Sequence, residues 1–366
     1  MKRTTACLIV HPRSGRNLAR VPEVVSVLAA AGWTTDVVVK ESKGQTMELA
    51  GRAAEAGYDF VIAYGGDGTM NHVINGVLAF AGRRETAVGM IPGGTANVWA
   101  TEVGIATDPV RAARTLVESV VRPVDVGHVG VESLTFGGGA TATALDRETV
   151  LAPGARRYFL LMAGLGVDAA LMGRTPSGLK HKLGIAAVAL TALRQLPTLR
   201  TYPVGIRSGD TGSLVWEGRA LQLVVGNTRL YGGVARMTPD ALLDSGELDL
   251  SVITARSRFS ALGQVLALVL RGRPAHAHAV ASRGPRFRVT VPASVGLQLD
   301  GSAVNLSKYL TAPARVTLER AGDPALVSVE YVFDAVPAAL RIAIPADYDG
   351  SLFREGAAGT SPADPR

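Results

Sequence analysis

At about 150 residues per domain, the 366 residues of this chain predict two or three domains. Apolar residues make up 47% and charged residues 19%, a balance that excludes an intrinsically disordered chain. The single cysteine, Cys7, excludes a disulfide framework within one chain and a cysteine-rich zinc site. The net charge of +7 suits anionic partners such as nucleotide phosphates or acidic lipid headgroups, but charge alone does not choose among them.

The sequence has no run of apolar residues that reaches the roughly 18 needed to cross a bilayer. The longest candidate, residues 183–193, stops at eleven. The apolar run at residues 6–10 is too short for a signal peptide. We therefore expect a cytoplasmic protein.

The first 126 residues alternate between strand and helix signals. Short apolar runs that end in Gly or Pro alternate with helical segments of about ten residues, a pattern typical of a parallel sheet with crossover helices. We predict strands at residues 7–10, 36–39, 60–64 and 88–91, and helices at 18–31, 47–56, 71–80 and from 96.

After residue 126 the pattern changes to short strands separated by turns. Such spacing favours an antiparallel sandwich or barrel. We predict strands at residues 126–134, 157–162, 204–207, 221–225, 248–253, 287–291, 295–299, 315–318 and 339–344, with helices at 183–196 and about 259–270. The division is an α/β domain at 1–126, a β-rich domain at 127–334, and a disordered tail at 350–366 that is rich in Gly, Ala, Ser and Pro.

The strongest motif is the run Gly65-Gly66-Asp67-Gly68-Thr69, where a buried strand gives way to a helix. Glycines at such a corner let backbone N–H groups approach an anion, and the helix N-terminus adds partial positive charge. Thr69 could cap the helix or bond a phosphate. Asp67 would repel phosphates unless it binds a bridging Mg²⁺ or accepts a proton from an attacking hydroxyl. The alternative is an ordinary tight turn.

Two further corners repeat this strand-to-helix pattern. One is residues 91–97, which read IPGGTAN, and the other is residues 11–15, which read HPRSG. Each alone is weak, because Pro-Gly corners are ordinary turns. In a doubly wound sheet, however, corners of this kind face one crevice.

Together these motifs resemble the diacylglycerol kinase catalytic-domain family of lipid kinases, which includes sphingosine kinases. The resemblance rests on GGDGT with Asn71 and Asn75-Gly76, on IPGGTAN, and on later segments in the same order. Those segments are residues 164–168, 226–233, 239–249 and 299–301, so that the match covers roughly residues 4–345.

The resemblance implies an N-terminal domain like that of phosphofructokinases and NAD kinases, and a C-terminal antiparallel β-sandwich. A strand at about 335–348 would return to the first domain, and ATP with Mg²⁺ would lie between the domains. The residues implied to bind the nucleotide are Ser14, Gly65, Gly66, Asp67, Gly68, Thr69, Asn71, Gly94 and Thr95. The implied metal ligands are Asp67, Asp244 and Glu247, and the implied catalytic positions are Asp67, Asp300 and Ser302.

Several departures from the family pattern lie close to the chemistry. The family's Asp-Gly-Glu, whose glutamate is usually assigned as the general base, is here Asp300-Gly301-Ser302. A serine hydroxyl does not take up a proton near pH 7. The resemblance to sphingosine kinases implies Asp67 as a substitute base, and Asp300 and His72 are further candidates, with pKa values that burial could tune. In the metal loop, Ser245 stands before Gly246, and Asp244 could substitute only by a local shift.

Basic segments suggest transient contact with an anionic membrane. Residues 180–182 read KHK before the apolar 183–190 run, and residues 271–288 hold five arginines and no acid. Such segments suit acidic lipid headgroups, although solvated or buried faces would look the same. Few aromatics and no recognised motif argue against nucleic acid. The family resemblance allows a homodimer.

The sequence therefore predicts an ATP- and Mg²⁺-dependent kinase of diacylglycerol or a similar lipid alcohol. The alternative is a nucleotide- or lipid-binding protein on the same scaffold with little kinase activity, which Ser302 favours. An NAD kinase also carries GGDGT, but residues 231–249 and the IPGGTAN corner argue against it.

Overall fold

The computed structural model describes residues 3–12, 17–42, 44–79, 85–137, 139–143, 155–166, 200–232, 235–255 and 279–354. The expected helices at 183–196 and 259–270, and the expected nucleotide ligand Ser14, lie outside these residues. No helix in the described ranges is long and apolar enough to span a bilayer.

The N-terminal part is a parallel sheet with helices on both faces. Its strands are β1 (Thr5–Val10), β2 (Thr34–Val39), β3 (Phe60–Gly65) and β4 (Ala87–Pro92), in the spatial order β2-β1-β3-β4. The helices are α1 (Asn17–Ala30), α2 (Gln45–Glu55), α3 (Asp67–Ala79), α4 (Val98–Val103) and α5 (Pro109–Val117).

Alternate side chains of the central strands bury against different helices. In β1, Cys7 and Ile9 join a core with α2 and α3, whereas Leu8 and Val10 join a core with α1 and α5. Burial on both faces explains why these strands read as continuous apolar runs. The predicted doubly wound α/β domain is confirmed.

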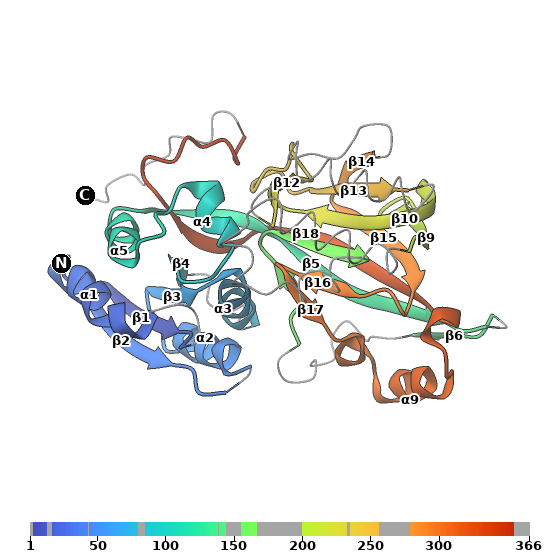
Figure 1. Ribbon diagram of the computed structural model, residues 1–366, viewed down its shortest axis with the longest axis horizontal. Helices are drawn as coiled ribbons and strands as arrows, with labels where there is room; N and C mark the ends of the chain where they lie inside the picture. Colours follow the sequence, from blue (N-terminus) through green and yellow to red (C-terminus); the bar gives the residue numbers. More distant parts are fainter. Residues whose placement is uncertain are drawn as a thin grey trace.

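Two long antiparallel strands run from this domain into the second one (Figure 1). They are β5 (Val120–Thr135) and β18 (Ser328–Ile344). The last part of β18 pairs in parallel with β4, while its first part pairs antiparallel with β15 (Arg286–Pro292). Because both strands cross between the domains, the predicted boundary at residue 126 falls inside β5, and the returning strand begins before residue 335.

The C-terminal part is a β-rich layered domain, as predicted. Its larger strands are β8 (Met162–Gly166), β9 (Tyr202–Ser208), β10 (Leu214–Gly226), β13 (Leu248–Thr254) and β14 (Ala279–Gly284). Shorter strands are β6 (Thr141–Thr143), β7 (Tyr158–Phe159), β11 (Leu230–Tyr231), β12 (Ala235–Arg236), β16 (Leu297–Leu299) and β17 (Ser302–Val304). An apolar core of Val, Leu, Phe and Tyr fills the space between them.

One predicted strand is wrong. Residues 315–318 belong to the helix α9 (Ala312–Arg320). Thr311 caps this helix by accepting the Ala314 N–H, and Pro313 stands in its first turn, where a missing N–H costs nothing. The apolar-polar alternation of four residues was too short to separate strand from helix.

Residues 350–354 also differ from the predicted disordered tail, because they pack on the protein. Leu352 and Phe353 are buried, and the Leu352 carbonyl accepts the Leu243 N–H at 2.8 Å. The Arg122 guanidinium lies 3.7 Å from the centre of the Phe353 ring. These two apolar residues anchor a segment whose Gly and Ser content favoured disorder.

Candidate active site

The first glycine corner connects β3 directly to α3, so the helix begins at Asp67, four residues before the predicted start. The Gly66 carbonyl accepts the N–H groups of Thr69 and Met70 at 2.9 and 3.1 Å. A Cβ on Gly65 would lie 2.4 Å from Thr69 Oγ1, so only glycine fits there. The corner therefore places the positive end of α3 at the edge of the sheet.

The second glycine corner, between β4 and α4, touches the first. A Cβ on Gly94 would lie 2.4 Å from Gly66 Cα, and the Gly93 N–H donates to the Gly65 carbonyl at 2.8 Å. Asn97 brackets Gly94, because its Oδ1 accepts the Gly94 N–H at 2.9 Å and its Nδ2 donates to the Gly94 carbonyl at 3.0 Å. The two corners form one rigid floor, as their common sheet edge predicted.

The Asp67 side chain, in the first corner, forms a hydrogen bond with the helix that follows the second corner. Its carboxylate accepts the Trp99 N–H at 3.2 Å, in the first turn of α4. Burial raises the pKa of Asp67 above its ordinary value, while backbone N–H groups of Val98 and Trp99 oppose that rise. The carboxylate thus lies at the N-termini of two helices, where negative charge is stabilised.

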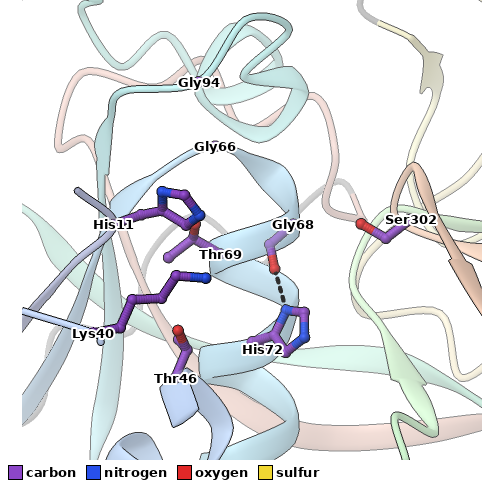
Figure 2. Close-up of a pocket in the computed structure, with 9 residues that line it drawn as sticks. All are labelled: His11, Lys40, Thr46, Gly66, Gly68, Thr69, His72, Gly94 and Ser302. Carbon is purple, nitrogen blue, oxygen red and sulfur yellow. Dashed lines mark hydrogen bonds between the residues drawn. The ribbon is translucent and has the colours of Figure 1, made fainter. Parts of the chain in front are cut away.

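A polar cavity of about 300 Å³ lies beside the first corner (Figure 2). Its lining residues are His11, Lys40, Thr46, Gly66, Gly68, Thr69, His72, Gly94 and Ser302. The described lining contains no carboxylate, and three of its side chains carry nitrogen. With the N-terminus of α3, this lining suits an anion such as a phosphate group.

His72 is held in one orientation inside this cavity. Its Nδ1 lies 2.7 Å from the Gly68 carbonyl, which requires Nδ1 to carry the proton and leaves Nε2 as the acceptor (Figure 2). Burial lowers the pKa of His72 to about 4, so the ring is neutral near pH 7. It therefore offers a hydrogen-bonding group to the cavity, not a positive charge.

A second cavity of about 260 Å³ lies between the two domains. We call it the interdomain cavity. Its lining comprises Gly66, Asp67, Gly68, Thr95, Ala96, Val98, Leu161, Met162, Leu230, Tyr231, Gly232, Gln298, Asp300, Gly301 and Ser302. The side chains of Val98, Leu161, Met162 and Leu230 give it apolar walls. It shares Gly66, Gly68 and Ser302 with the polar cavity, so the two meet at the GGDG turn.

Asp300 anchors the turn that carries Ser302. It is buried, and its carboxylate accepts the N–H groups of Leu160, Leu161 and Met162 at 3.0, 2.9 and 3.0 Å. It also accepts Asn71 Nδ2 from α3 at 2.8 Å. Burial raises the pKa of Asp300, although these four donors oppose the rise. Because these hydrogen bonds reach Asn71 in the N-terminal domain and residues 160–162 in the β-rich domain, Asp300 holds the two domains together.

Arg156 completes this network and was missed in the sequence. Its guanidinium donates to Asn71 Oδ1 at 3.0 Å and to the carbonyls of Ser302 and Ala303 at 3.3 and 3.0 Å. Burial lowers its pKa, and Asp300 opposes that effect. No motif marks this position, because the contacts join residues about 85 to 147 positions apart.

The predicted site residues separate into three groups. Gly66, Gly68, Thr69, Gly94 and Ser302 line the polar cavity, and Asp67, Thr95 and Asp300 line the interdomain cavity. Gly65 and Asn71 line neither of these two cavities; instead they support the corner and the Asp300 network. Thr46 in the polar cavity was missed, because it belongs to α2 and to no motif.

The predicted metal ligands are not brought together. Among the residues that the structure describes, no three His, Cys, Asp or Glu side chains gather closely enough to hold a metal. The Asp244 carboxylate accepts the Arg354 N–H at 3.0 Å, on the segment that was expected to be disordered. Asp125, a lone acid between two buried valines, accepts the N–H groups of Gly246 and Ala338 at 2.6 and 2.8 Å.

Comparison with protein families assigns both parts of the chain. Residues 5–129 match the diacylglycerol kinase catalytic domain, and residues 162–343 match the YegS C-terminal NAD kinase beta sandwich-like domain. A diacylglycerol kinase of Bacillus subtilis is 30% identical over 305 residues, covering 82% of this chain and 90% of that protein. This chain belongs to the diacylglycerol kinase family.

Other members of the family agree along most of the chain. A diacylglycerol kinase of Staphylococcus saprophyticus is 28% identical over 320 residues, which is 84% of this chain and 94% of that protein. A crystal structure of a Bacillus anthracis diacylglycerol kinase superposes with a TM-score of 0.63 at 18% identity, covering 94% of this chain and 98% of the other. That structural similarity shows the shared two-domain fold.

The described residues fit the phosphates of a family cofactor, ATP. The close contact between Gly66 and Gly94 leaves no room for side chains at the edge of the polar cavity, and the N-terminus of α3 lies at the same edge, where phosphate is stabilised. Asp67 lines the interdomain cavity between the shared residues Gly66 and Gly68, and its carboxylate could contact a phosphate-bound Mg²⁺. A metal site built wholly from protein ligands is not formed by the described residues.

Proposed function

We propose that this protein is an ATP- and Mg²⁺-dependent kinase that phosphorylates the hydroxyl of diacylglycerol or a similar lipid alcohol. The observation that carries this proposal is the junction of two unlike cavities at the GGDG turn. One is polar and rich in nitrogen, and the other has apolar walls. Phosphates in the first and a lipid hydroxyl in the second would meet at Gly66, Gly68 and Ser302.

In this proposal the chain acts mainly by positioning, which dominates phosphoryl transfer. Gly66, Gly68, Thr69 and Gly94 hold the phosphates, and His72 and Lys40 contact them or the attached sugar. Bound Mg²⁺ would neutralise phosphate charge, with Asp67 as its contact on the protein. The apolar walls orient the acceptor and exclude water from the reacting groups.

When the acceptor hydroxyl is phosphorylated it loses its proton, which a base must accept. In the described part of the chain, Asp67 and Asp300 are the carboxylates that line the interdomain cavity. Asp300 already accepts four hydrogen bonds, which makes it a poor base. We therefore assign orientation of the hydroxyl, and uptake of its proton, to the Asp67 carboxylate oxygen that would not contact Mg²⁺. Burial raises the pKa of Asp67, which favours proton uptake, while the backbone N–H groups of Val98 and Trp99 oppose that rise and a bound Mg²⁺ would oppose it further.

The test is transfer of labelled γ-phosphate from Mg-ATP to diacylglycerol in detergent micelles, and to a cell lipid extract. We expect a labelled lipid with the wild type and at least about a 10²-fold lower rate with Asp67→Ala. Asp210→Ala, which removes an exposed acid far from both cavities in sequence, serves as the matched control. A product that persists in Asp67→Ala would contradict the role of this carboxylate.

A binding protein without turnover is the second candidate, and Ser302 is the observation that favours it. Ser302 stands at the junction of the cavities, and its hydroxyl is not a base near neutral pH. A wild type that transfers nothing while Ser302→Glu does, with a gain within the 10²–10⁴-fold range of general-base catalysis, would select this candidate. An active wild type would exclude it.

Because the proposed acceptor is a lipid, we also propose transient association with anionic membranes. Co-sedimentation with vesicles that contain about 30% anionic lipid, compared with neutral vesicles, tests this. Binding that weakens with salt would support an electrostatic contact. Equal binding to both vesicle types would contradict it.

A further inference from the structure

One carboxylate links the two walls of the interdomain cavity. Glu102 lies on α4, in the N-terminal domain. Its Oε1 accepts the Arg229 N–H at 2.9 Å and also the Leu230 N–H, both in the β-rich domain. These are contacts between segments 127 and 128 positions apart in the chain.

Both partners of this contact lead directly into the cavity lining. Leu230, Tyr231 and Gly232 form part of one wall. Thr95, Ala96 and Val98, which precede and begin the helix that carries Glu102, form part of the wall that the N-terminal domain contributes. The distance between these walls therefore depends on the Glu102 contact.

The Arg229 side chain also fixes the segment 229–232 to other parts of the chain. The Arg229 side chain donates to the carbonyls of Ala241, at 3.2 Å, and Ser351. Its backbone N–H is already bonded to Glu102. Residue 229 is thus the fixed point from which residues 230–232 extend along the cavity, and Glu102 determines where that point lies relative to α4.

We propose that Glu102 is a positioning residue that sets the width of the interdomain cavity, and with it the affinity for the lipid acceptor. This inference rests on the proposed lipid kinase function. It assigns to Glu102 no contact with the reacting atoms, because Glu102 is not among the residues that line either cavity. Its effect should therefore appear in the KM for the lipid and not in the KM for ATP.

The contact should also respond to pH. Burial raises the pKa of Glu102 to about 7, while the two N–H donors, the Thr228 hydroxyl and the Arg229 guanidinium oppose the rise. A carboxylate is a stronger acceptor than a protonated carboxyl group. As the pH falls through about 7, the contact weakens. The lipid KM of the wild type should then rise, while the ATP KM should not.

Two variants separate hydrogen bonding from charge. Glu102→Gln keeps an oxygen that can accept both N–H groups but does not ionise, so its lipid KM should not change between pH 6 and 8. Glu102→Ala removes the acceptor, and we expect its lipid KM to rise on the order of 10-fold, with kcat and the ATP KM nearly unchanged. Glu118→Ala, at an exposed acid of the same domain, is the matched control.

A second measurement does not depend on catalysis. Amide hydrogen exchange of residues 229 and 230 should lose at least about 10-fold of its protection in Glu102→Ala and keep it in Glu102→Gln and Glu118→Ala. Equilibrium binding of a short-chain diacylglycerol to the same proteins should weaken in parallel with that loss. Unchanged protection, or lost protection with unchanged lipid affinity, would overturn the inference.

The two measurements also distinguish failure of this inference from failure of the proposed function. The proposed function is judged on the wild type alone, by its phosphate transfer to lipid. The inference is judged on the difference between Glu102→Ala and Glu118→Ala in amide protection and diacylglycerol binding. A wild type that binds diacylglycerol without phosphorylating it therefore refutes the proposed kinase function, while the role of Glu102 can still be tested.

Discussion

Replacement of Asp300 by Asn separates an anchoring role from a catalytic one. Asn has nearly the same shape, and it tolerates the left-handed backbone that Asp300 adopts at φ 45°. In the wild type one carboxylate oxygen accepts the N–H groups of Leu161 and Met162. The other accepts the Leu160 N–H and the Asn71 side chain. In either orientation of the asparagine amide, its NH₂ group replaces an oxygen that accepted two hydrogen bonds, so two donors lose their acceptor.

The expected cost follows from those two donors. A buried donor left without an acceptor costs about 1–3 kcal/mol, so the pair costs about 2–6 kcal/mol, a large share of the roughly 5–15 kcal/mol of a typical domain. With a denaturant dependence of about 1–3 kcal/mol per M in urea, the unfolding midpoint should fall by about 1 M or more. Unfolding at pH 8, followed by circular dichroism, measures this.

Asp323→Asn is the matched control, because Asp323 is exposed and its carboxylate accepts the Ala325 N–H at 2.9 Å. Its midpoint should move by a small fraction of the shift in Asp300→Asn. If both variants unfold alike, the four hydrogen bonds do not carry the stability assigned to them. If Asp300→Asn keeps wild-type stability but loses kcat, Asp300 acts on the reacting groups and not as an anchor.

Further predictions concern the floor and the wall of the polar cavity. Gly94→Ala should destabilise the protein by about 1–3 kcal/mol and abolish nucleotide binding, because the new Cβ would lie 2.4 Å from Gly66 Cα. Gly205→Ala is the control: the nearest atom to its Cβ is 4.0 Å away, so neither stability nor nucleotide binding should change. Calorimetry with ATP checks both, and nucleotide binding by Gly94→Ala would contradict the close approach of the corners. Because burial lowers the pKa of His72 to about 4, its neutral form stabilises the fold above about pH 6.5, and that contribution is lost as the pH falls toward 4. His72→Gln should therefore lose less stability than the wild type between pH 7 and pH 5, as urea unfolding at the two values would show.

Local sequence patterns predicted the N-terminal domain well, because burial on both faces makes each central strand a continuous apolar run. The runs at 60–64 and 88–91 correspond to β3 and β4 within one residue at each end. Helix α3 was harder, since its first turn consists of Asp67, Gly68 and Thr69, which are residues typical of turns. The Gly66 carbonyl, not residue propensity, fixes where that helix begins.

The functions of individual site residues were less predictable, because they depend on contacts between distant parts of the chain. Asn71 belongs to the motif region, yet its side chain bonds Asp300 and Arg156 and lines neither cavity described above. Asp300 was expected to act in catalysis, but its carboxylate meets backbone N–H groups 138 to 140 positions away. No local spacing could reveal these partners.

Ser302 is the residue that bears most directly on the choice between a kinase and a binding protein. An ideal Cβ on Gly68 would lie 3.0 Å from Ser302 Oγ, so the hydroxyl points at the GGDG turn. Arg156 fixes the backbone of the same residue through its carbonyl. A glutamate at position 302 would start from this fixed backbone and carry its carboxylate past Gly68 into the space where the cavities meet. Ser302→Glu therefore tests the chemistry of the junction, because the network that positions residue 302 is already in place.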